Sequence, residues 1–518
     1  MPVPSQNPVT PEKAILGKLL FWEEQLSTDN RVACGTCHTF AAGGGDTRRR
    51  RMAGVDGVFN TADDVFASPG IRRSDANNDY LPDPVVGFAT QVTDRSSPTF
   101  LTAAWFTDLF WDGRASGTFL DPDSGSVLIP SGGALESQSM GPPLSPVEMA
   151  HDMRTFAQLT GKLADSKPMA LATNLPSDMA AAIAGGVTYP DLFQTAFGTP
   201  DVTAARIAYA IATYERTLVP DQTPYDAFVA GNTNALSAQE RQGLNVFMGP
   251  GRCNLCHTSG LFSDDRFHNL GLRPISEDNG RQGVTGSVAD AGRFKTPSLR
   301  NVGLRNTFMH NGEFTSLQEV VLFYVQGGGP NQQNKDPLLQ PLQQNVPPPA
   351  GAALAQFLAT GLTDPRVASG LPPFDRPTLR RQLLPEAGVQ SGIPTLGSGN
   401  QVTQILAGVP ANIGNPDFKI GVYGALGGST GVLAVGTAAG SSQINGVNVN
   451  VDLNGAILMP YMLQGTPGVA GDGWASVRTP LPDDPGLIGI SVYPQWFVWD
   501  NGTAGGASAS RAARVDIF

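Results

Sequence analysis

Two Cys-x-x-Cys-His runs constrain this chain more than any other feature of its sequence. They are "CGTCH" at residues 34–38 and "CNLCH" at residues 253–257. The four cysteines of the chain all belong to these runs: Cys34, Cys37, Cys253 and Cys256. In such a run the two sulfurs form thioethers to the vinyl groups of haem, and the adjacent imidazole binds the iron. The pattern therefore predicts two covalently bound haem c groups, with His38 and His257 as proximal ligands.

Two other interpretations of paired cysteines fit this pattern less well. A thioredoxin-like redox pair does not require the histidine that follows each second cysteine. A zinc ribbon places its two pairs about 15 to 20 residues apart, whereas Cys37 and Cys253 are much farther apart in the chain. With all four cysteines assigned to haem, none is left for a disulfide or a reactive thiol.

The haem runs also predict the compartment in which the protein works. Bacterial haem c attachment takes place outside the cytoplasm, so we expect a periplasmic or extracellular protein. The first ten residues, "MPVPSQNPVT", have neither the basic nor the apolar segment of a signal peptide, and we expect that one has been removed. No stretch is long and apolar enough to predict a membrane span. The formal charge of −11, with no basic block interleaved with aromatics, argues against nucleic acid as a partner.

Helical segments precede both haem runs. Residues 9–26 have a helical pattern with Thr10 as N-cap and a proline at the first helical position, and they lead to the first run. Helical periodicity returns over residues 148–233, and residues 232–257 repeat the order of a helix followed by a haem run. Residues 43–85, in contrast, are loop-like. The layout therefore predicts two similar helical units.

The last quarter of the chain has a different character. Residues 386–518 contain few charged residues and neither cysteine nor histidine, so they cannot bind a haem iron through either side chain. Apolar stretches separated by Gly, Asn and Pro are typical of strands, and here they are residues 418–426, 430–437, 447–453 and 486–500. We therefore predict an all-β, sandwich-like domain over residues 386–518.

Several long motifs accompany the haem runs in a fixed order. They are "SSPTFLTAAWFTDLFWDGR", "LESQSMGPPLSPVEMA", "YERTL", "RFHNLG" and "FKTPSLRNVGLRNTFMHNGEFTSLQEVVLFY". With them the sequence resembles, over about residues 8–380, the bacterial di-haem cytochrome c peroxidases and their relative MauG, which uses peroxide to oxidise residues of another protein. The resemblance implies a mainly α fold of two cytochrome c-like haem domains. We place the peroxidatic domain at residues 1–220, with the loop insertion, and the second at 221–385.

The resemblance implies an acid–base group over the first haem. Glu148 in "PVEM" matches the family's distal carboxylate, and Gln138 matches its distal amide. A base must take a proton from bound hydrogen peroxide and return it to the leaving oxygen, while a neutral donor holds the peroxide. From the residues alone, Glu148 could instead be a carboxylate in the first turn of a helix that follows Pro146.

One departure from the peroxidases concerns the first haem. In those enzymes a histidine upstream of the "SSPT" motif closes the sixth position of the peroxidatic iron until the partner haem is reduced. Here the corresponding place holds Phe88, and no histidine occurs between His38 and His151. We therefore expect a first haem that lacks the blocking ligand and meets peroxide without prior reduction, as in MauG.

A second departure concerns the other haem. Fourteen positions after His310, where peroxidases have an axial methionine, the chain has Tyr324, as MauG does. A phenolate is a harder ligand than a thioether and should lower the potential of the haem. Two alternatives remain open: Met309 as the ligand, or Tyr324 as a core residue of a helix that Ser316 and Glu319 cap.

The resemblance suggests two further groups between the haems. Trp111, in "FWDGR", is the predicted aromatic relay, although Gly251 stands where MauG has a second tryptophan. The family's calcium ion binds an asparagine side chain, which is Ser96 here, and backbone carbonyls that correspond to Arg305 and Thr307. Because the asparagine is replaced, calcium is a weaker expectation than haem.

Together these features predict a di-haem peroxidase that reduces hydrogen peroxide with electrons from a protein or another donor, with MauG-like properties. One alternative is an electron-transfer di-haem cytochrome without substrate chemistry. Another is a binding protein whose β-domain docks the haem module to a partner. Gln138 with Glu148 favours the enzyme, because an electron carrier has no use for a distal acid–base pair.

Overall fold

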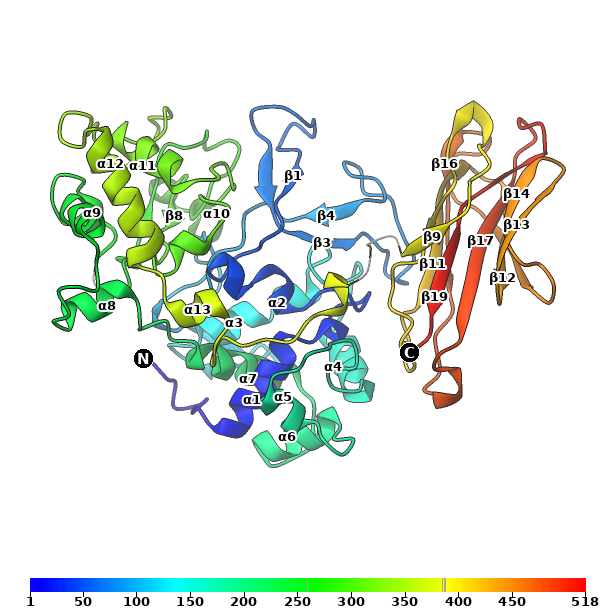
Figure 1. Ribbon diagram of the computed structural model, residues 1–518, viewed down its shortest axis with the longest axis horizontal. Helices are drawn as coiled ribbons and strands as arrows, with labels where there is room; N and C mark the ends of the chain where they lie inside the picture. The colour runs from blue at the N-terminus through cyan, green and yellow to red at the C-terminus, as the bar shows by residue number, and fades with distance from the viewer. Residues whose placement is uncertain (259, 384, 386–387) are drawn as a thin grey trace.

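The computed structural model describes residues 1–258, 260–383, 385 and 388–518, and it has two helical bodies beside a body of long strands (Figure 1). The helices of the first body are α1 (Pro11–Phe21), α2 (Cys34–Cys37), α3 (Ala134–Ser139), α4 (Phe156–Asp165), α5 (Ser177–Ala182), α6 (Tyr189–Phe197), α7 (Ala204–Thr217) and α13 (Pro365–Ser369). Those of the second body are α8 (Pro224–Val229), α9 (Ala238–Met248), α10 (Gln282–Thr285), α11 (Leu317–Val325) and α12 (Pro348–Gln356). None of the described helices is both long enough and apolar enough to cross a membrane.

The first body is built around the crossing of α1 and α7. Thr10 caps α1 by accepting a hydrogen bond from the backbone of Lys13 (3.3 Å), as the sequence predicts, but the helix ends at Phe21 rather than near residue 26. The two helices approach so closely that a Cβ on Gly17 would lie 1.9 Å from the carbonyl oxygen of Ala210. Only glycine leaves room for this crossing.

The second body repeats this arrangement with α9 and α12. Ser237 and Glu240 form a capping box at the start of α9, where the Glu240 N–H donates to Ser237 Oγ (3.2 Å). A Cβ on Gly243 would lie 2.1 Å from the carbonyl oxygen of Ala353 in α12, so this crossing also requires glycine. Since α1 and α9 each precede a Cys-x-x-Cys-His run, the repeated order in the sequence corresponds to a structural repeat.

The chain returns to the first body after it has formed the second. Helix α13 and the segment that follows it add three side chains to the core around α1 and α7: Val367, Phe374 and Leu379. The buried Glu24 carboxylate also accepts a hydrogen bond from the backbone N–H of Arg380 (2.7 Å). The division at residues 220 and 385 therefore stays a prediction, and the predicted start of the β-domain, Glu386, lies outside the described residues.

The helical bodies also contain short two-stranded sheets. They pair β1 (Arg50–Met52) with β2 (Val65–Ala67), β3 (Pro69–Arg72) with β4 (Thr90–Val92), β5 (Phe119–Leu120) with β6 (Val127–Ile129), and β7 (Phe267–His268) with β8 (Phe294–Lys295). Strands β1 to β3 lie within residues 43–85, so this region is less loop-like than its Gly- and Asp-rich sequence suggests.

The last quarter of the chain forms two packed sheets and a separate two-stranded sheet. The strands are β9 (Val389–Ser391), β10 (Gln404–Leu406), β11 (Lys419–Leu426), β12 (Thr430–Gly436), β13 (Ala439–Ile444), β14 (Val447–Val451), β15 (Ile457–Met462), β16 (Ala470–Arg478), β17 (Ser491–Trp499), β18 (Ala507–Ala509) and β19 (Ala512–Asp516). One sheet has the order β10-β11-β16, and the other has the order β15-β12-β17-β19-β9 with β18 also paired to β17. Strands β13 and β14 pair with each other in the two-stranded sheet. Val422 and Val477 of the first sheet share a core with Leu433 and Trp496 of the second. Each stretch predicted as a strand contains one.

Hydrogen bonds and an ion pair connect the β body to the first helical body. Lys419 on β11 is buried, and its ammonium group donates hydrogen bonds to Ser74 Oγ (2.8 Å) and to the backbone carbonyl of Asn78 (2.6 Å). Lys162 of α4 forms an ion pair with Asp417 (2.7 Å). These directional contacts define how the β body docks on the first helical body.

Candidate active site

A cavity of the first body lies beside the first Cys-x-x-Cys-His run. It is lined by Cys34, Cys37 and His38 together with apolar side chains such as Phe100. The Nδ1 of His38 donates a hydrogen bond to the carbonyl oxygen of Gly44 (3.1 Å). This bond leaves Nε2 as the ring nitrogen with a lone pair for a metal. We call this space the first cavity.

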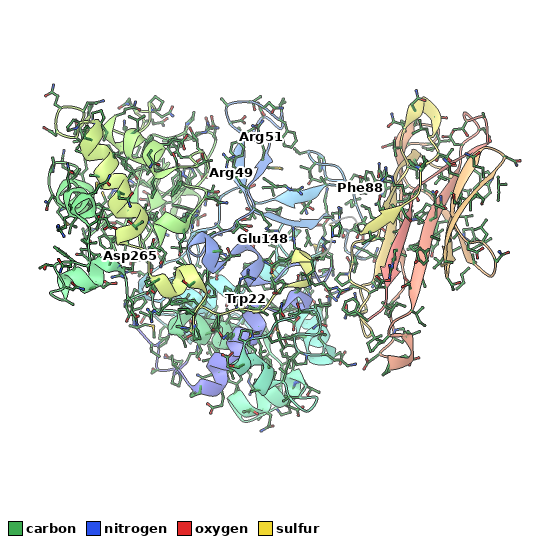
Figure 2. All side chains as sticks on the ribbon, in the orientation of Figure 1. Trp22, Arg49, Arg51, Phe88, Glu148 and Asp265 are labelled. Atoms are coloured by element: carbon green, nitrogen blue, oxygen red, sulfur yellow. The ribbon has the colours of Figure 1, made fainter. Side chains whose placement is uncertain are left out.

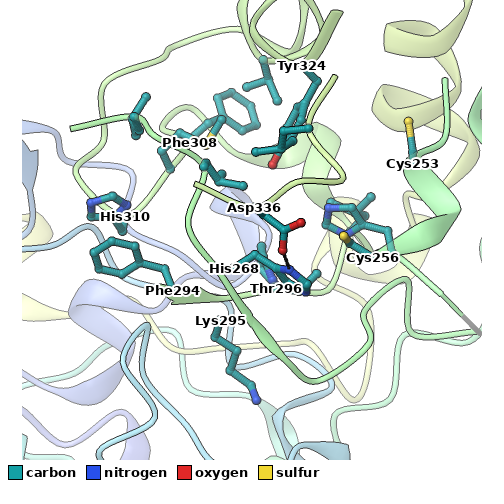
Figure 3. Close-up of a pocket in the computed structure, with 18 of the residues that line it drawn as sticks. Cys253, Cys256, His268, Phe294, Lys295, Thr296, Phe308, His310, Tyr324 and Asp336 are labelled. Atoms are coloured by element: carbon teal, nitrogen blue, oxygen red, sulfur yellow. Dashed lines mark hydrogen bonds and ion pairs between the residues drawn. The ribbon is translucent and has the colours of Figure 1, made fainter. Parts of the chain in front are cut away.

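The second cavity lies beside the second run, in the other helical body (Figure 3). It is lined by Cys253, Cys256 and His257, and by side chains of α11 and α12. The Nδ1 of His257 donates to the carbonyl oxygen of Phe262 (2.8 Å), so both histidines are held in the same way. Because the two cysteine pairs lie in separate cavities, one zinc site built from both pairs is excluded.

The residues around the cavities fit haem c. Burial raises the pKa of the Cys37 thiol to about 12, and it also raises the pKa of Cys34. Burial lowers the pKa of His38 and of His257. The first cavity therefore offers neutral thiols, which can become thioethers, and each cavity offers a neutral imidazole, which can bind iron.

Glu148 and Gln138 both line the first cavity. Gln138 lies at the end of α3, whereas Glu148 lies in a turn and the next helix, α4, begins only at Phe156. The interpretation of Glu148 as a carboxylate in the first turn of a helix is therefore wrong. Burial raises the pKa of Glu148, the charge of Arg114 opposes this shift, and that of Asp94 adds to it. A carboxyl group in such a place can take up and return a proton.

Sequence patterns did not indicate a second carboxyl group in the first cavity. Glu215 of α7 lines it and is only 6% exposed. Within the described part of the chain its Oε2 has no hydrogen-bond partner. Burial raises the pKa of Glu215 to about 8, against the effect of Arg216, so the group is largely protonated at neutral pH. In the sequence, only its position in the "YERTL" motif could have marked Glu215 as a site residue. Helical periodicity does not distinguish a residue that lines a cavity from one that packs in the core.

Phe88 lies away from the first cavity and against the β body (Figure 2). Its ring stacks on Tyr423 with centroids 4.9 Å apart and packs at 6.0 Å from the ring of Trp474. Among the described residues that line the first cavity, His38 is the one histidine. The cavity therefore presents no second imidazole from this part of the chain.

Tyr324 and Met309, the rival candidates for the second axial ligand, both line the second cavity. Tyr324 lies near the end of α11, whose start is capped by Ser316 and Glu319 as predicted (Glu319 N–H to Ser316 Oγ, 3.2 Å). Figure 3 shows its hydroxyl group pointing into the cavity. Burial raises the pKa of Tyr324, and the nearby Cys256 adds to the shift. The choice between the two ligands stays a prediction.

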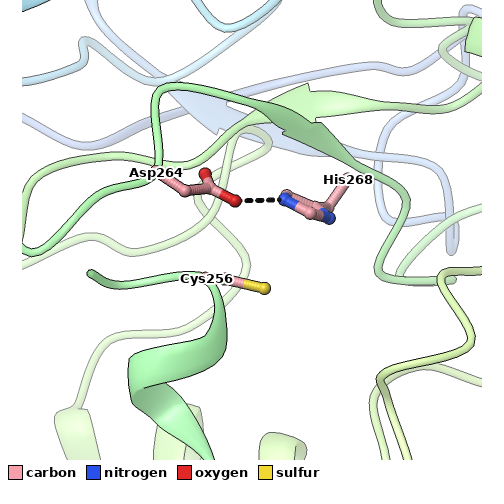
Figure 4. Close-up of side chains that lie close together, drawn as sticks. All are labelled: Cys256, Asp264 and His268. Carbon is pink, nitrogen blue, oxygen red and sulfur yellow. Dashed lines mark hydrogen bonds and ion pairs between the residues drawn. The ribbon is translucent and has the colours of Figure 1, made fainter.

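A polar cluster beside the second cavity is an ion-pair network. Cys256, Asp264 and His268 have ligand atoms within 4.8 Å of one another (Figure 4). His268 Nε2 pairs with Asp264 (2.9 Å), and its Nδ1 pairs with Asp336 (2.6 Å). Asp264 above all, with Cys256 and Asp336, raises the pKa of His268 to about 11. With both ring nitrogens protonated, His268 has no lone pair for a metal.

Trp111 lies where the two cavities meet. It lines both of them, as do Pro98, Thr99 and residues 295–298. Its indole N–H donates to the carbonyl oxygen of Ser96 (2.8 Å), which fixes the orientation of the ring. Trp111, the relay predicted from the sequence, is therefore an aromatic side chain that lines both cavities.

The residues predicted to hold calcium lie close together, but two of the three expected ligand oxygens have other hydrogen-bond partners. Ser96 Oγ donates a hydrogen bond to the carbonyl oxygen of Met309 (2.7 Å). The carbonyl oxygen of Thr307 accepts a hydrogen bond from Nε of Arg305 (3.2 Å). Calcium needs about six to eight oxygen ligands, and a guanidinium group among them would repel it. The residues at this place therefore do not fit calcium.

Comparison with known proteins identifies the family of this chain. The family model described as di-haem cytochrome c peroxidase matches residues 11–234. Methylamine utilization protein MauG of Methylorubrum extorquens is 31% identical over 331 residues, which are 63% of this chain and 72% of that protein. The chain belongs to the di-haem cytochrome c peroxidase and MauG family. Cytochrome c551 peroxidase of Nitrosomonas europaea, another member, is 28% identical over 324 residues, 62% of this chain and 75% of that protein.

A solved structure shows that the fold is shared as well. The crystal structure of a MauG-like protein associated with microbial copper homeostasis matches with a TM-score of 0.52 at 23% identity, over 72% of this chain and 96% of that chain. As a member of the di-haem peroxidase family, the protein is an oxidoreductase that acts on hydrogen peroxide and uses haem c. The resemblance recognised from the sequence motifs is thereby confirmed.

Proposed function

We propose that this family member is a MauG-like di-haem peroxidase that reacts with hydrogen peroxide without prior reduction of its second haem. The composition of the first cavity carries the proposal, because Gln138 and Glu148 line it and its described lining includes no histidine besides His38. An electron-transfer cytochrome, the rival function, needs no acid–base group beside an iron. The proposed cofactor ligands are His38 for the first haem and His257 with Tyr324 for the second.

The protein's part in peroxide reduction is to move protons and hold the substrate. Bound haem supplies the iron at which hydrogen peroxide takes two electrons and two protons to give two molecules of water. Glu148 accepts the proton of one peroxide oxygen and returns it to the other, which then leaves as water. Gln138 donates an amide hydrogen bond that holds the peroxide in place. Because burial raises its pKa, Glu148 is a stronger base than an exposed glutamate.

At the second cavity Tyr324 would hold the iron together with His257, in preference to Met309. The hydroxyl points into the cavity from the end of a capped helix, which limits its movement. Burial raises the pKa of Tyr324, but a ferric iron beside it would favour loss of the proton. The phenolate would then lower the potential of this haem, unlike a methionine thioether.

The proposal is tested by mixing the fully ferric protein with hydrogen peroxide in the absence of reductant. We expect peroxide to be consumed and the haem absorption to change at once, because the first cavity has no imidazole that must leave. Prior reduction of the second haem should not be required. If the ferric protein is inert and only the half-reduced protein reacts, the chain is a conventional peroxidase.

We propose Trp111 as the relay through which the two haems exchange electrons, since it lines both cavities. Trp111→Phe should delay the spectral change of the second haem after peroxide is added, while peroxide binding at the first is retained. Trp105→Phe is the matched control, because Trp105 lies in the same motif but is not among the residues lining either cavity. Stopped-flow absorption of both variants would show an equal delay if Trp111 had no special role.

The remaining assignments concern attachment, compartment and partners. We propose that both haems are covalently attached through the two cysteine pairs and that the protein works in the periplasm or outside the cell. Its partners would be hydrogen peroxide and either an electron-donor protein or an oxidisable substrate. Curated relatives with the name of cytochrome c551 peroxidase support a redox partner of this kind.

A further inference from the structure

The guanidinium group of Arg305 lies at the junction of the two helical bodies. Its Nη2 donates to the carbonyl oxygen of Ser97 in the first body (2.9 Å), and its Nε donates to that of Thr307 (3.2 Å). Burial alone lowers the pKa of Arg305 to about 10, with no carboxylate among the described residues acting on it. A guanidinium group keeps its proton at physiological pH, so Arg305 is a cation held by backbone carbonyl groups.

The same guanidinium group packs against the loop that orients His38. A Cβ on Gly45 would lie 2.6 Å from Nη1 of Arg305, so the guanidinium group lies directly against this loop and a side chain at residue 45 would displace it. The adjacent Gly44 supplies the carbonyl oxygen that accepts the hydrogen bond from His38 Nδ1 (3.1 Å). Arg305 therefore supports the backbone that fixes the proximal ligand of the first haem.

Arg305 also lines the second cavity. One side chain thus touches the "SSPT" segment, the loop behind His38 and the site of the second haem. We propose that the Arg305 guanidinium is the resident cation between the two haem sites, where it replaces the calcium ion implied by the family resemblance. In this position it couples the surroundings of the second haem to the proximal ligand of the first.

Arginine chemistry suits this role. The guanidinium group has five N–H donors and no acceptor, so it can serve several carbonyl oxygens at once, and it keeps its charge at any physiological pH. A calcium ion among the same carbonyl groups would contact this cation and be repelled by it. Guanidinium and calcium therefore exclude each other at this place. A tethered cation also cannot be removed by a chelator.

The first experiment uses the wild-type protein with both haems. We expect metal analysis to find less than stoichiometric calcium. Treatment with EGTA, or addition of calcium, should leave the absorption and paramagnetic resonance spectra of both haems unchanged. One calcium ion per chain whose removal shifts either spectrum would overturn the proposal. This outcome would leave the proposed reaction with peroxide untouched, since the inference rests on the haem sites and not on their reactivity.

The second experiment removes the cation by Arg305→Thr. This change frees the carbonyl groups of Ser97 and Thr307, so we expect a shift in the spectrum of the first haem that added calcium reverses. Arg49→Gln is the matched control, because Arg49 also donates to a backbone carbonyl oxygen across the junction, that of Gly312 (3.1 Å), but is not among the residues lining either cavity. The control should show no shift and no response to calcium.

Each other outcome contradicts part of the proposal. An Arg305→Thr protein whose spectrum matches the wild type would show that the cation does not couple the sites. A shift that calcium fails to reverse, or one that Arg49→Gln reproduces, would show that guanidinium and calcium are not interchangeable here. If the variant does not fold, the calcium content and EGTA response of the wild type still decide the main claim.

Discussion

Replacing Glu148 by glutamine is expected to slow the cleavage of hydrogen peroxide by about 10² to 10⁴-fold, the usual contribution of a positioned acid–base group. Glutamine has nearly the same shape, so the first cavity should stay intact, but it cannot take the proton from peroxide. The rate should be measured by stopped flow at saturating peroxide, so that weaker binding does not imitate slower chemistry.

The pH dependence sharpens this prediction. Burial raises the pKa of Glu148, and the base must be deprotonated to act, so the wild-type rate should fall as the pH drops through this raised pKa. The acidic limb should begin at a higher pH than an exposed glutamate would give, and it should vanish in Glu148→Gln. Glu12→Gln, at an exposed position in the first turn of α1, is the control. An unchanged rate in the Glu148 variant would remove this residue from the mechanism.

Changes at Tyr324 are expected to alter both the spin state and the potential of the second haem. Tyr324→Phe removes the hydroxyl that points into the second cavity, so the sixth position of that iron should open and its low-spin signal should be lost. Tyr324→Met supplies a thioether in place of the phenolate, and the potential of this haem should rise. Spectroelectrochemical titration of both variants measures these shifts.

Met309 provides the matched control for the Tyr324 variants. It lines the same cavity, and Met309→Leu keeps its size and apolar character while removing the sulfur. If Tyr324 is the ligand, Met309→Leu should leave the spin state and potential of the second haem unchanged. If the low-spin signal is lost in Met309→Leu but normal in Tyr324→Phe, Met309 is the ligand of the second haem iron. The protein would then be a conventional peroxidase.

Features carried by neighbouring residues could be predicted from the sequence. The haem runs bring Cys34 and His38 together within one turn, and the capping boxes at α9 and α11 follow from residues three positions apart. The strands of the β body follow from apolar stretches bounded by turn residues. Glu148 is different, since its local pattern suggested a helix start that the structure does not have. Its place in the first cavity followed only from resemblance to a family.

Contacts between distant segments could not be predicted in this way. Phe88 was recognised by what it replaces, but its stacking on Tyr423 depends on how the β body docks. The family resemblance points only to the backbone carbonyl group of Arg305, whereas in the structure its guanidinium group bonds to Ser97 across the junction. Where that group lies depends on the loop at Gly45, far away in the chain, and no local pattern encodes such an approach.

Electron paramagnetic resonance of the fully oxidised protein with both haems tests the central claim most directly. If the first cavity has no blocking imidazole and Tyr324 closes the second iron, the spectrum should contain one high-spin ferric haem, bound by His38, and one low-spin ferric haem, bound by His257. Two low-spin ferric signals with no high-spin component would contradict this account, because both irons would then be closed by protein ligands before peroxide arrives.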